Sequence, residues 1–464
     1  MNLRFMLLAF SFCAGLSAAT LAPPQDQQLA HDIYKQLVEI KSGYSTGSTT
    51  LVADAVAARL RDAGFPASDI FEGGAAPNKA NIVVRYHGTG ARRPVLLLAH
   101  EDVVEAKRED WTTDPFQFIE KDGFYYGRGT ADDKAQAAIW IANLIRYKRE
   151  GFRPDRDIIV ALTADEEGGG PYSGIQWLLK NHRDLIDAEF CLNEGARGEV
   201  VNGKLISNDL QVSEKWYVDF RLEVVNKGGH SSLPVADNAI YHLAAALDKL
   251  AHFGFPLKTN DVTKAYFASM AKIESGAIRQ DLEGAASGAQ SSMERVAAAT
   301  PAWNATLRTT CVATQLEGGH AHNALPQLAA ANVNCRVEPE DSLEYVTATL
   351  KKVIADDQVK ISVTGEALQS PGSPMRPDIL RAVNRMTDSL WPGVPVVPSQ
   401  LSAATDGKYL RAAGIPTYGV QGFPLDRDDN RAHGRDERMP VKSFYEGQTF
   451  LFELVKILTS PAGN

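Results

Sequence analysis

The chain has 464 residues, of which 44% are hydrophobic and 23% charged, and its formal net charge is -9. This length exceeds what a single hydrophobic core usually supports, so we expect two domains. The acidic balance, without any basic run, argues against nucleic acid or an anionic membrane surface as a partner.

The N-terminus has the pattern of an export signal. Met1–Arg4 is a short basic start, Phe5–Leu16 is apolar, and Ser17–Ala19 offers small residues for cleavage. Residues 1–19 are therefore predicted to be the signal peptide of a secreted or periplasmic protein. The apolar stretch is too short to span a membrane and no later stretch qualifies, so we expect no integral membrane segment after cleavage.

Apolar runs in the first half of the chain are typical of buried strands that end at polar side chains. Leu96–Ala99 ends at His100, and Ile158–Leu162 ends just before an acidic turn. Ala135–Arg146 has the spacing of a helix, which places Asp132 on a strand-to-helix loop. Because ligand sites in open α/β sheets gather at the carboxyl ends of strands, these polar residues are expected to lie close together.

Four short stretches, in order along the chain, are rich in side chains that bind metal ions. They are His100–Val104, Gly127–Lys134, Asp165–Gly168 and Ala432–Glu437. Taken alone, each has an ordinary explanation, such as a solvated acidic turn or a loop histidine. Zinc accepts both imidazole and carboxylate ligands, and each stretch follows an apolar or Gly-rich run that can hold it in place. Together they indicate a two-metal hydrolase.

The second half of the chain has the pattern of a smaller domain inserted into the first. A ferredoxin-like βαββαβ lid is predicted, and because the last metal-ligand stretch lies beyond it, the lid must interrupt the catalytic domain. Residues 258–301 form a helical excursion longer than a connection requires. The elements expected are strands Trp216–Val225, Asn304–Thr314, Ala329–Val337 and Val359–Val363, with helices Asn238–Leu250 and Ser342–Ile354. We expect the catalytic domain at 20–212 and 373–464 and the lid at 213–372.

Three cysteines remain after removal of the leader. Cys311 and Cys335 lie in two strand-like runs of the lid, where they form either a disulfide, which export permits, or two buried thiols. Cys191 has no His or Asn motif nearby that would make it a nucleophile.

The order and the residues of the four stretches resemble the motifs of a family of zinc-dependent hydrolases. That family includes aminoacylases, acetylornithine deacetylase, glutamate carboxypeptidases, carnosine dipeptidases and carboxypeptidase S, and the likeness covers nearly the whole mature chain. Trp111, Asp114–Phe116 and Tyr126–Lys134 are most similar to the branch of carboxypeptidase S and secreted N-acyl-amino-acid hydrolases. The resemblance implies an α/β catalytic domain that binds two Zn²⁺ ions, which Co²⁺ or Mn²⁺ can replace.

The same resemblance implies a set of metal ligands. Asp132 would bridge the two ions with its two carboxylate oxygens. Glu167 and His433 would join it on one ion, and His100 and Glu194 on the other. The family uses either Asp or Glu at the position of Glu194.

Catalytic roles follow from the resemblance in the same way. Glu166 would be the general base that takes a proton from the attacking water and returns it to the leaving amine. Asp102 would accept a hydrogen bond from the far ring nitrogen of His100 and fix its tautomer. In the family, the peptide bond that corresponds to Asp132-Asp133 is cis.

Three features outside the metal cluster bear on the substrate. The resemblance implies that His230 stabilises the oxyanion, often from a partner subunit's lid. It implies that Asn323 binds the substrate carbonyl and Arg336 its free α-carboxylate, although Arg336 also fits an outward strand residue in a surface ion pair. Thr405 and Asp406 match a loop that lines the family's pocket, and they also fit a plain polar turn.

We therefore expect an exported enzyme that removes a C-terminal amino acid from a peptide or N-acyl substrate. Within the same chemistry, the alternatives are an aminoacylase, a dipeptidase that requires a free amine, and the reverse condensation of amino acids with fatty acids. Rivals of another class are a catalytically silent binding protein and a two-metal phosphoesterase. If His230 acts in trans, the protein is a homodimer through the lid.

Overall fold

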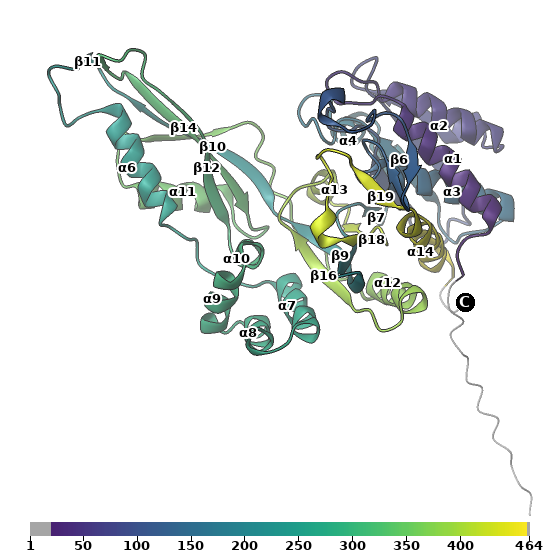
Figure 1. Cartoon of the computed structure of the whole chain (residues 1–464). Helices are drawn as coiled ribbons and strands as arrows, with labels where there is room; N and C mark the ends of the chain where they lie inside the picture. The colour runs from purple at the N-terminus through teal and green to yellow at the C-terminus, as the bar shows by residue number, and fades with distance from the viewer. Residues whose placement is uncertain (1–19, 462–464) are drawn as a thin grey trace, which may run out of the picture.

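A computed structural model describes residues 20–461, and the predicted signal peptide lies outside the described residues. The chain folds into two lobes, a large α/β domain and an elongated lid that extends away from it (Figure 1). Within residues 20–461, no helix has the length and apolarity that crossing a bilayer requires.

A ten-stranded mixed sheet forms the centre of the large domain. Its strand order is β1-β2-β6-β3-β7-β17-β9-β8-β18, with β16 paired to β9. Strands β3, β6 and β7 are parallel, so their carboxyl ends meet at one edge. The bounds are β1 Ile70–Gly74, β2 Ala80–Tyr86, β3 Val95–His100, β6 Ile158–Thr163, β7 Phe190–Asn193, β8 Gly198–Val201, β9 Lys204–Glu214, β16 Val396–Leu401, β17 Thr417–Gly419 and β18 Pro424–Asp426.

Helices cover both faces of this sheet, because successive side chains of a strand point to opposite faces. Leu97 of β3 packs into the larger core, whereas Leu96 and Leu98 pack into a second core on the other face. The larger core contains helices α1 Pro24–Glu39, α2 Thr50–Asp62, α3 Lys134–Glu150, α12 Pro377–Leu390 and α14 Val441–Thr459; the second contains α4 Gly174–Asn181, α5 Arg183–Ile186 and α13 Gly407–Ala412. A small sheet, β19-β5-β4, adds β4 Ile119–Lys121, β5 Phe124–Tyr126 and β19 Arg438–Pro440.

The lid has the βαββαβ order expected from the sequence. Its sheet runs β12-β14-β10-β15, which is the strand order of a ferredoxin-like fold. Alternate residues of β10, such as Phe220 and Leu222, are buried together with residues of α6 and α11, while the intervening residues face away from that core. The bounds are β10 Trp216–Val225, β11 Gly229–His230, α6 Ala239–Ala251, β12 Thr310–Gly318, β13 Ala324–Leu325, β14 Leu328–Val337, α11 Leu343–Ile354 and β15 Lys360–Thr364.

Cys311 and Cys335 face each other across β12 and β14 and form a disulfide. Of the two alternatives left open by the sequence, the structure has the disulfide. Cys191 is a buried free thiol.

One predicted lid strand starts too early. The chain from 304 to 307 belongs to helix α10 Pro301–Leu307, and strand β12 begins only at Thr310. Thr300 caps this helix by accepting from the backbone N–H of Trp303, and Pro301 occupies the first turn, where its missing N–H costs nothing.

The helical excursion packs against the catalytic sheet. Helices α7 Asp261–Ile273, α8 Ala277–Ala286, α9 Gln290–Ala299 and α10 form their own apolar core, which includes Val397 of β16. Gln400 of β16 accepts a hydrogen bond from Asn260, which caps α7, at 2.9 Å and donates one to Glu338 of the lid at 2.7 Å. The excursion therefore connects the lid with the catalytic domain.

Candidate metal centre and substrate pocket

The two oxygens of the Asp132 carboxylate face different histidines. His100, the last residue of β3, places Nε2 3.0 Å from Oδ1, and His433 places Nε2 3.1 Å from Oδ2. Asp132 lies on the loop before α3, where its peptide bond to Asp133 is cis. Since each oxygen has a separate histidine, the carboxylate has the orientation that a bridge between two cations requires.

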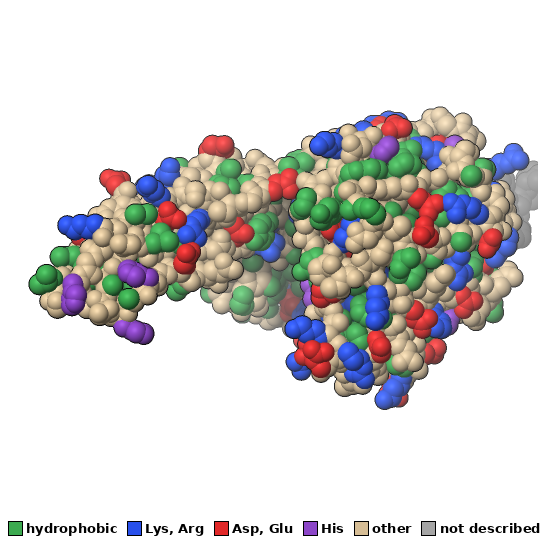
Figure 2. Space-filling model, turned by 90° about the horizontal axis from the view of Figure 1, so that it is seen from above, with side chains coloured by type: hydrophobic (Ala, Val, Ile, Leu, Met, Phe, Trp, Pro, Cys, Tyr) green, Lys and Arg blue, Asp and Glu red, His purple; other side chains and the backbone are tan. Residues whose placement is uncertain are grey.

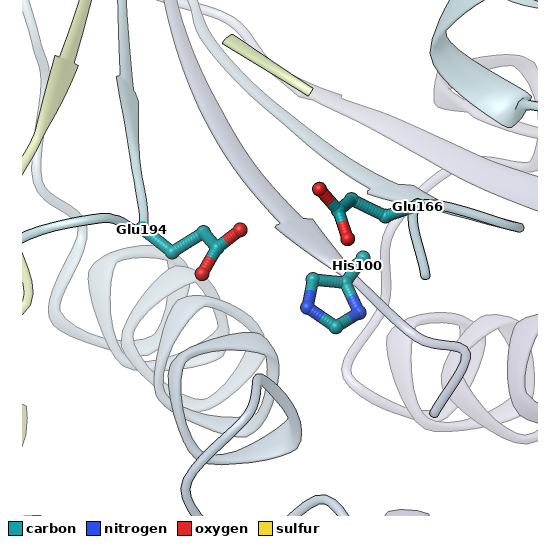
Figure 3. A group of neighbouring side chains, drawn as sticks. All are labelled: His100, Glu166 and Glu194. Carbon is teal, nitrogen blue, oxygen red and sulfur yellow. The ribbon is translucent and has the colours of Figure 1, made fainter. Parts of the chain in front are cut away.

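Carboxylates from two further strand ends complete the cluster. Glu167, after β6, lies 2.8 Å from Nε2 of His433, and its ligand atom is within 4.8 Å of those of His100 and Asp132. Glu194, after β7, and Glu166 form a second group with His100, again within 4.8 Å (Figure 3). Figure 3 shows the two glutamates on opposite sides of the His100 ring.

The electrostatics of this cluster favour bound cations. Burial raises the pKa of Glu166 and of Glu194 well above the usual range, and neighbouring carboxylates add to the effect. Hydrogen bonds to Asp132 and Glu167 raise the pKa of His433 to about 10. The donors are those that zinc accepts, and ligand atoms about 3 Å apart fit a shared ion with bonds of about 2.0–2.2 Å. The residues present therefore fit a dinuclear metal centre.

Asp102 supports the cluster differently from the expected way. Its backbone carbonyl lies 3.0 Å from Nδ1 of His100, and its carboxylate oxygen is farther from that nitrogen, at 3.7 Å. A carbonyl only accepts, so Nδ1 carries the proton and Nε2 is free to bind a metal. The Asp102 carboxylate instead accepts from the backbone N–H groups of Glu166 and Glu167, both at 3.1 Å.

A buried ion pair shapes the loop that carries Asp132. Glu437 accepts from the backbone N–H of Ala131 at 2.7 Å and of Asp132 at 3.1 Å, and it pairs with Arg128 at 2.5 Å. Arg128 also donates to the carbonyl of Gly434, next to His433. The pair thus holds together the two loops that carry Asp132 and His433, which are candidate metal ligands. Both residues belong to stretches singled out in the sequence, where this role was missed.

A cavity of about 510 Å³ opens onto the cluster. Asp132, Glu166, Glu167, Glu194 and His433 line it, and so does Thr405 of the expected pocket loop. Tyr266 and Thr306 of the helical excursion form part of its wall. No sequence motif pointed to Tyr266 of α7 or Thr306 of α10, because their place in the pocket depends on the packing of these helices and β16 in one core.

The loop with Thr405 and Asp406 contributes Thr405 to the cavity wall and contacts the end of β6 through Asp406. Thr405 donates through its backbone N–H and its hydroxyl to Glu214, at 3.1 and 3.0 Å. Asp406 accepts from Thr163, the last residue of β6, at 2.7 Å, and burial raises its pKa to about 6.

The lid residues lie apart from the metal cluster. His230 belongs to β11, at the end of the lid far from the catalytic domain (Figure 1), and Asn323 directly precedes its partner strand β13. Seen from above, histidine side chains gather at this end (Figure 2). Arg336 of β14 stacks on Tyr217, with its guanidinium 4.8 Å from the ring centroid. His230, Asn323 and Arg336 are not among the residues that line the 510 Å³ cavity.

Comparisons with known proteins agree on one family. The sequence profile of peptidase family M20/M25/M40 matches residues 96–457. The N-fatty-acyl-amino acid synthase/hydrolase PM20D1 of Mus musculus is 29% identical, over 78% of this chain and 74% of its own. The probable carboxypeptidase S-like 2 of Dictyostelium discoideum is 30% identical, over 81% of this chain and 74% of its own.

Solved structures share the fold. An M20 family metallo-carboxypeptidase from Sulfolobus solfataricus superposes with a TM-score of 0.70 at 16% identity, covering 92% of this chain and 98% of its own. The likeness shows that this chain shares its fold with that protein over most of both chains.

Proposed function

Because this chain belongs to peptidase family M20/M25/M40, a family of metal-dependent hydrolases, we propose that it cleaves the amide bond to a C-terminal amino acid with a free carboxylate. The observation that carries the proposal is the Asp132 carboxylate between His100 and His433, with Glu166 beside His100. The relative named as a carboxypeptidase supports this substrate class.

In the proposed centre, His100, Asp132 and Glu194 hold one zinc ion, and Asp132, Glu167 and His433 hold the other. The ions would polarise the scissile carbonyl and make the attacking water more acidic. Glu166 would take a proton from that water and deliver it to the leaving nitrogen, because its carboxyl lies beside His100 and Glu194 and lines the cavity. Asp102 orients Glu166 through the backbone hydrogen bond.

The lid residues complete the proposed site from a second subunit. His230 would stabilise the oxyanion, Asn323 would bind the substrate carbonyl, and Arg336 would approach the α-carboxylate. The position of β11 at the far end of the lid supports action in trans within a homodimer. The proposed limits of the catalytic domain, 20–212 and 373–464, and of the lid, 213–372, separate these residues from the metal ligands.

Export is part of the proposal. The basic, apolar and small residues of 1–19 support a signal peptide. The Cys311–Cys335 disulfide supports an oxidising compartment, because such bonds are rare in the cytosol.

Hydrolysis of N-acyl amino acids is the second candidate. It is favoured by the likeness to a protein named as an N-fatty-acyl-amino acid synthase/hydrolase. The two candidates share the bond that is cleaved and differ in the group on the carbonyl side.

The test is release of amino acids from a panel of dipeptides, longer peptides and N-acyl amino acids, before and after removal of metal and with zinc restored. We expect zinc-dependent release that is lost in Glu166→Ala and kept in Glu109→Ala, a change of an exposed glutamate outside the pocket. If the wild type binds two zinc ions and hydrolyses nothing on the panel, the substrate assignment fails. A phosphate ester assay then separates a phosphoesterase from a binding protein.

A further inference from the structure

Arg197 occupies a place in the pocket that no sequence motif assigned. It lies between β7 and β8, shortly after Glu194, and its backbone carbonyl accepts a hydrogen bond from the N–H of Asp209 at 3.0 Å. Arg197 lines the 510 Å³ cavity and also a neighbouring cavity of about 610 Å³, so it lies where the two cavities meet.

Within residues 20–461, the guanidinium of Arg197 makes no hydrogen bond or ion pair. Two of the acidic side chains whose charges act on Arg197 are engaged elsewhere. Glu199 accepts from Arg427 at 2.9 Å, and Asp209 accepts from Ser207 at 2.8 Å. Burial lowers the pKa of Arg197, yet arginine stays charged in proteins. A half-buried cation without a partner is costly, and an anionic ligand would remove that cost.

The composition of the cavity wall makes this cation distinctive. Arg197 is the only Lys or Arg among the residues that line the 510 Å³ cavity, whereas its acidic residues are the metal ligands, Glu166, Glu199 and Asp209. Arg336, which the family resemblance assigns to the α-carboxylate, lies on the lid and stacks on Tyr217. In this arrangement of the domains, Arg197 is the arginine that a carboxylate inside the cavity can contact.

We propose that Arg197 binds a carboxylate of the substrate from within the same subunit that holds the metals. The proposal rests on the proposed function and narrows its substrate class to molecules with a carboxylate within reach of the metal centre. A planar guanidinium fork suits that group, because it makes two parallel charge-assisted hydrogen bonds. The carboxylate is either the α-carboxylate of the released amino acid or a second one on the acyl group.

Three matched substrates distinguish these two sources. They are the N-acetyl derivative of the amino acid that the panel releases best, its C-terminal amide, and its N-succinyl derivative. For an α-carboxylate ligand, Arg197→Gln lowers kcat/KM on the N-acetyl derivative by about 10- to 100-fold, chiefly through KM, and leaves the amide unchanged. For an acyl carboxylate, only the N-succinyl derivative is affected. Either pattern supports the proposal.

Arg279→Gln is the matched control, because it removes the same charge at an exposed residue of α8 that lines neither cavity. It should leave all three substrates unchanged. An equal loss on all three with Arg197→Gln would indicate a structural effect and overturn the proposal, as would no loss on any of them.

A binding experiment separates this inference from the proposed function. Zinc-loaded Glu166→Ala is titrated with the N-acetyl and N-succinyl derivatives in a calorimeter, with and without Arg197→Gln. Weaker binding with Arg197→Gln supports the inference even if the wild type turns over none of the panel, in which case the proposed function alone fails. Equal binding by both variants, or no binding by either, overturns the inference.

Discussion

The ion pair of Arg128 and Glu437 shows how single residues outside the metal cluster determine its shape. Both side chains are almost fully buried, at 3% and 0% exposure. Glu437 accepts hydrogen bonds from the backbone N–H groups of Ala131 and Asp132, so its charge and the position of Asp132 are linked.

Glu437→Gln should therefore destabilise the protein and weaken its affinity for metal. The change leaves Arg128 buried without a counter-charge, for which a cost of about 3–5 kcal/mol is typical. Urea unfolding of the metal-free protein measures the stability, and competition with a chelator measures zinc affinity. Asp110→Asn, which breaks the exposed pair with Arg435, is the control and should cost less than about 1 kcal/mol. If both changes cost the same, the Arg128–Glu437 pair does not hold the loop.

Asp209 gives a prediction on pH. Burial raises the pKa of its carboxyl to about 7, whereas an unfolded aspartate titrates near 3.9. Between these values the folded protein holds a proton that the unfolded chain releases, so this group lowers stability as pH rises from about 4 to 7. Asp209→Asn lacks the effect, so its Tm relative to the wild type should increase over that window and level off above it.

Thermal unfolding from pH 4 to pH 8 measures this difference. Asp54→Asn, on an exposed position of α2, controls for the loss of one negative charge. A Tm difference that is constant with pH would contradict the assignment to Asp209.

The candidate site residues that the sequence could identify are those that follow a regular local pattern. His100 was identifiable because it ends an apolar strand, and Glu166 and Glu167 because they follow another. Arg197 and Tyr266 could not be found in this way. Their role depends on neighbours from distant segments, and neither an arginine in a loop nor a tyrosine on a helix carries a pattern that distinguishes a pocket wall from an exposed surface.

At the scale of elements, the lid also has parts that a local sequence pattern predicts and parts that depend on tertiary contacts. Alternation along β10 and the helical spacing of α6 and α11 predicted these elements closely, because each buries one regular face. The start of β12 was placed too early, since the seven residues of α10 are too few to show a helical period. The packing of the excursion on β16 is a tertiary contact that no local pattern reports.

The disulfide between β12 and β14 should stabilise the lid. It closes a loop across a sequence separation of 24 residues, and such a cross-link typically contributes about 2–4 kcal/mol, mainly by restricting the unfolded chain. The double variant Cys311→Ala/Cys335→Ala is expected to unfold at lower temperature and to be insensitive to a reducing agent. Thermal unfolding with and without reductant measures both effects.

Cys191→Ala is the matched control, because it removes the buried free thiol and leaves the disulfide intact. It should retain the sensitivity to reductant. A double variant as stable as the wild type would show that the disulfide contributes nothing to folding stability.

At the scale of the whole molecule, the separation of β11 from the metal ligands makes a prediction about shared sites. If His230 acts in trans, Glu166→Ala and His230→Ala are each inactive as homodimers, yet a mixed dimer contains one complete site. Co-refolding equal amounts should restore about one quarter of the wild-type activity, because half of the dimers are mixed and each has one working site of two. Kinetic assay of the mixture, with each variant refolded alone as control, measures this; no recovery would place His230 in its own subunit's site.

The path of the chain through the central sheet determines how late in synthesis the metal centre can be completed. Strand β17 lies between β7 and β9, although the chain completes both of those strands and the whole lid before β17 is made. His433 follows later still. During synthesis, β7 and β9 are therefore complete before β17 can pair with them. His433, the last proposed metal ligand, is made after β17. A growing chain would carry the other proposed ligands and the proposed general base but no complete metal centre, so hydrolysis would begin only when synthesis is almost finished.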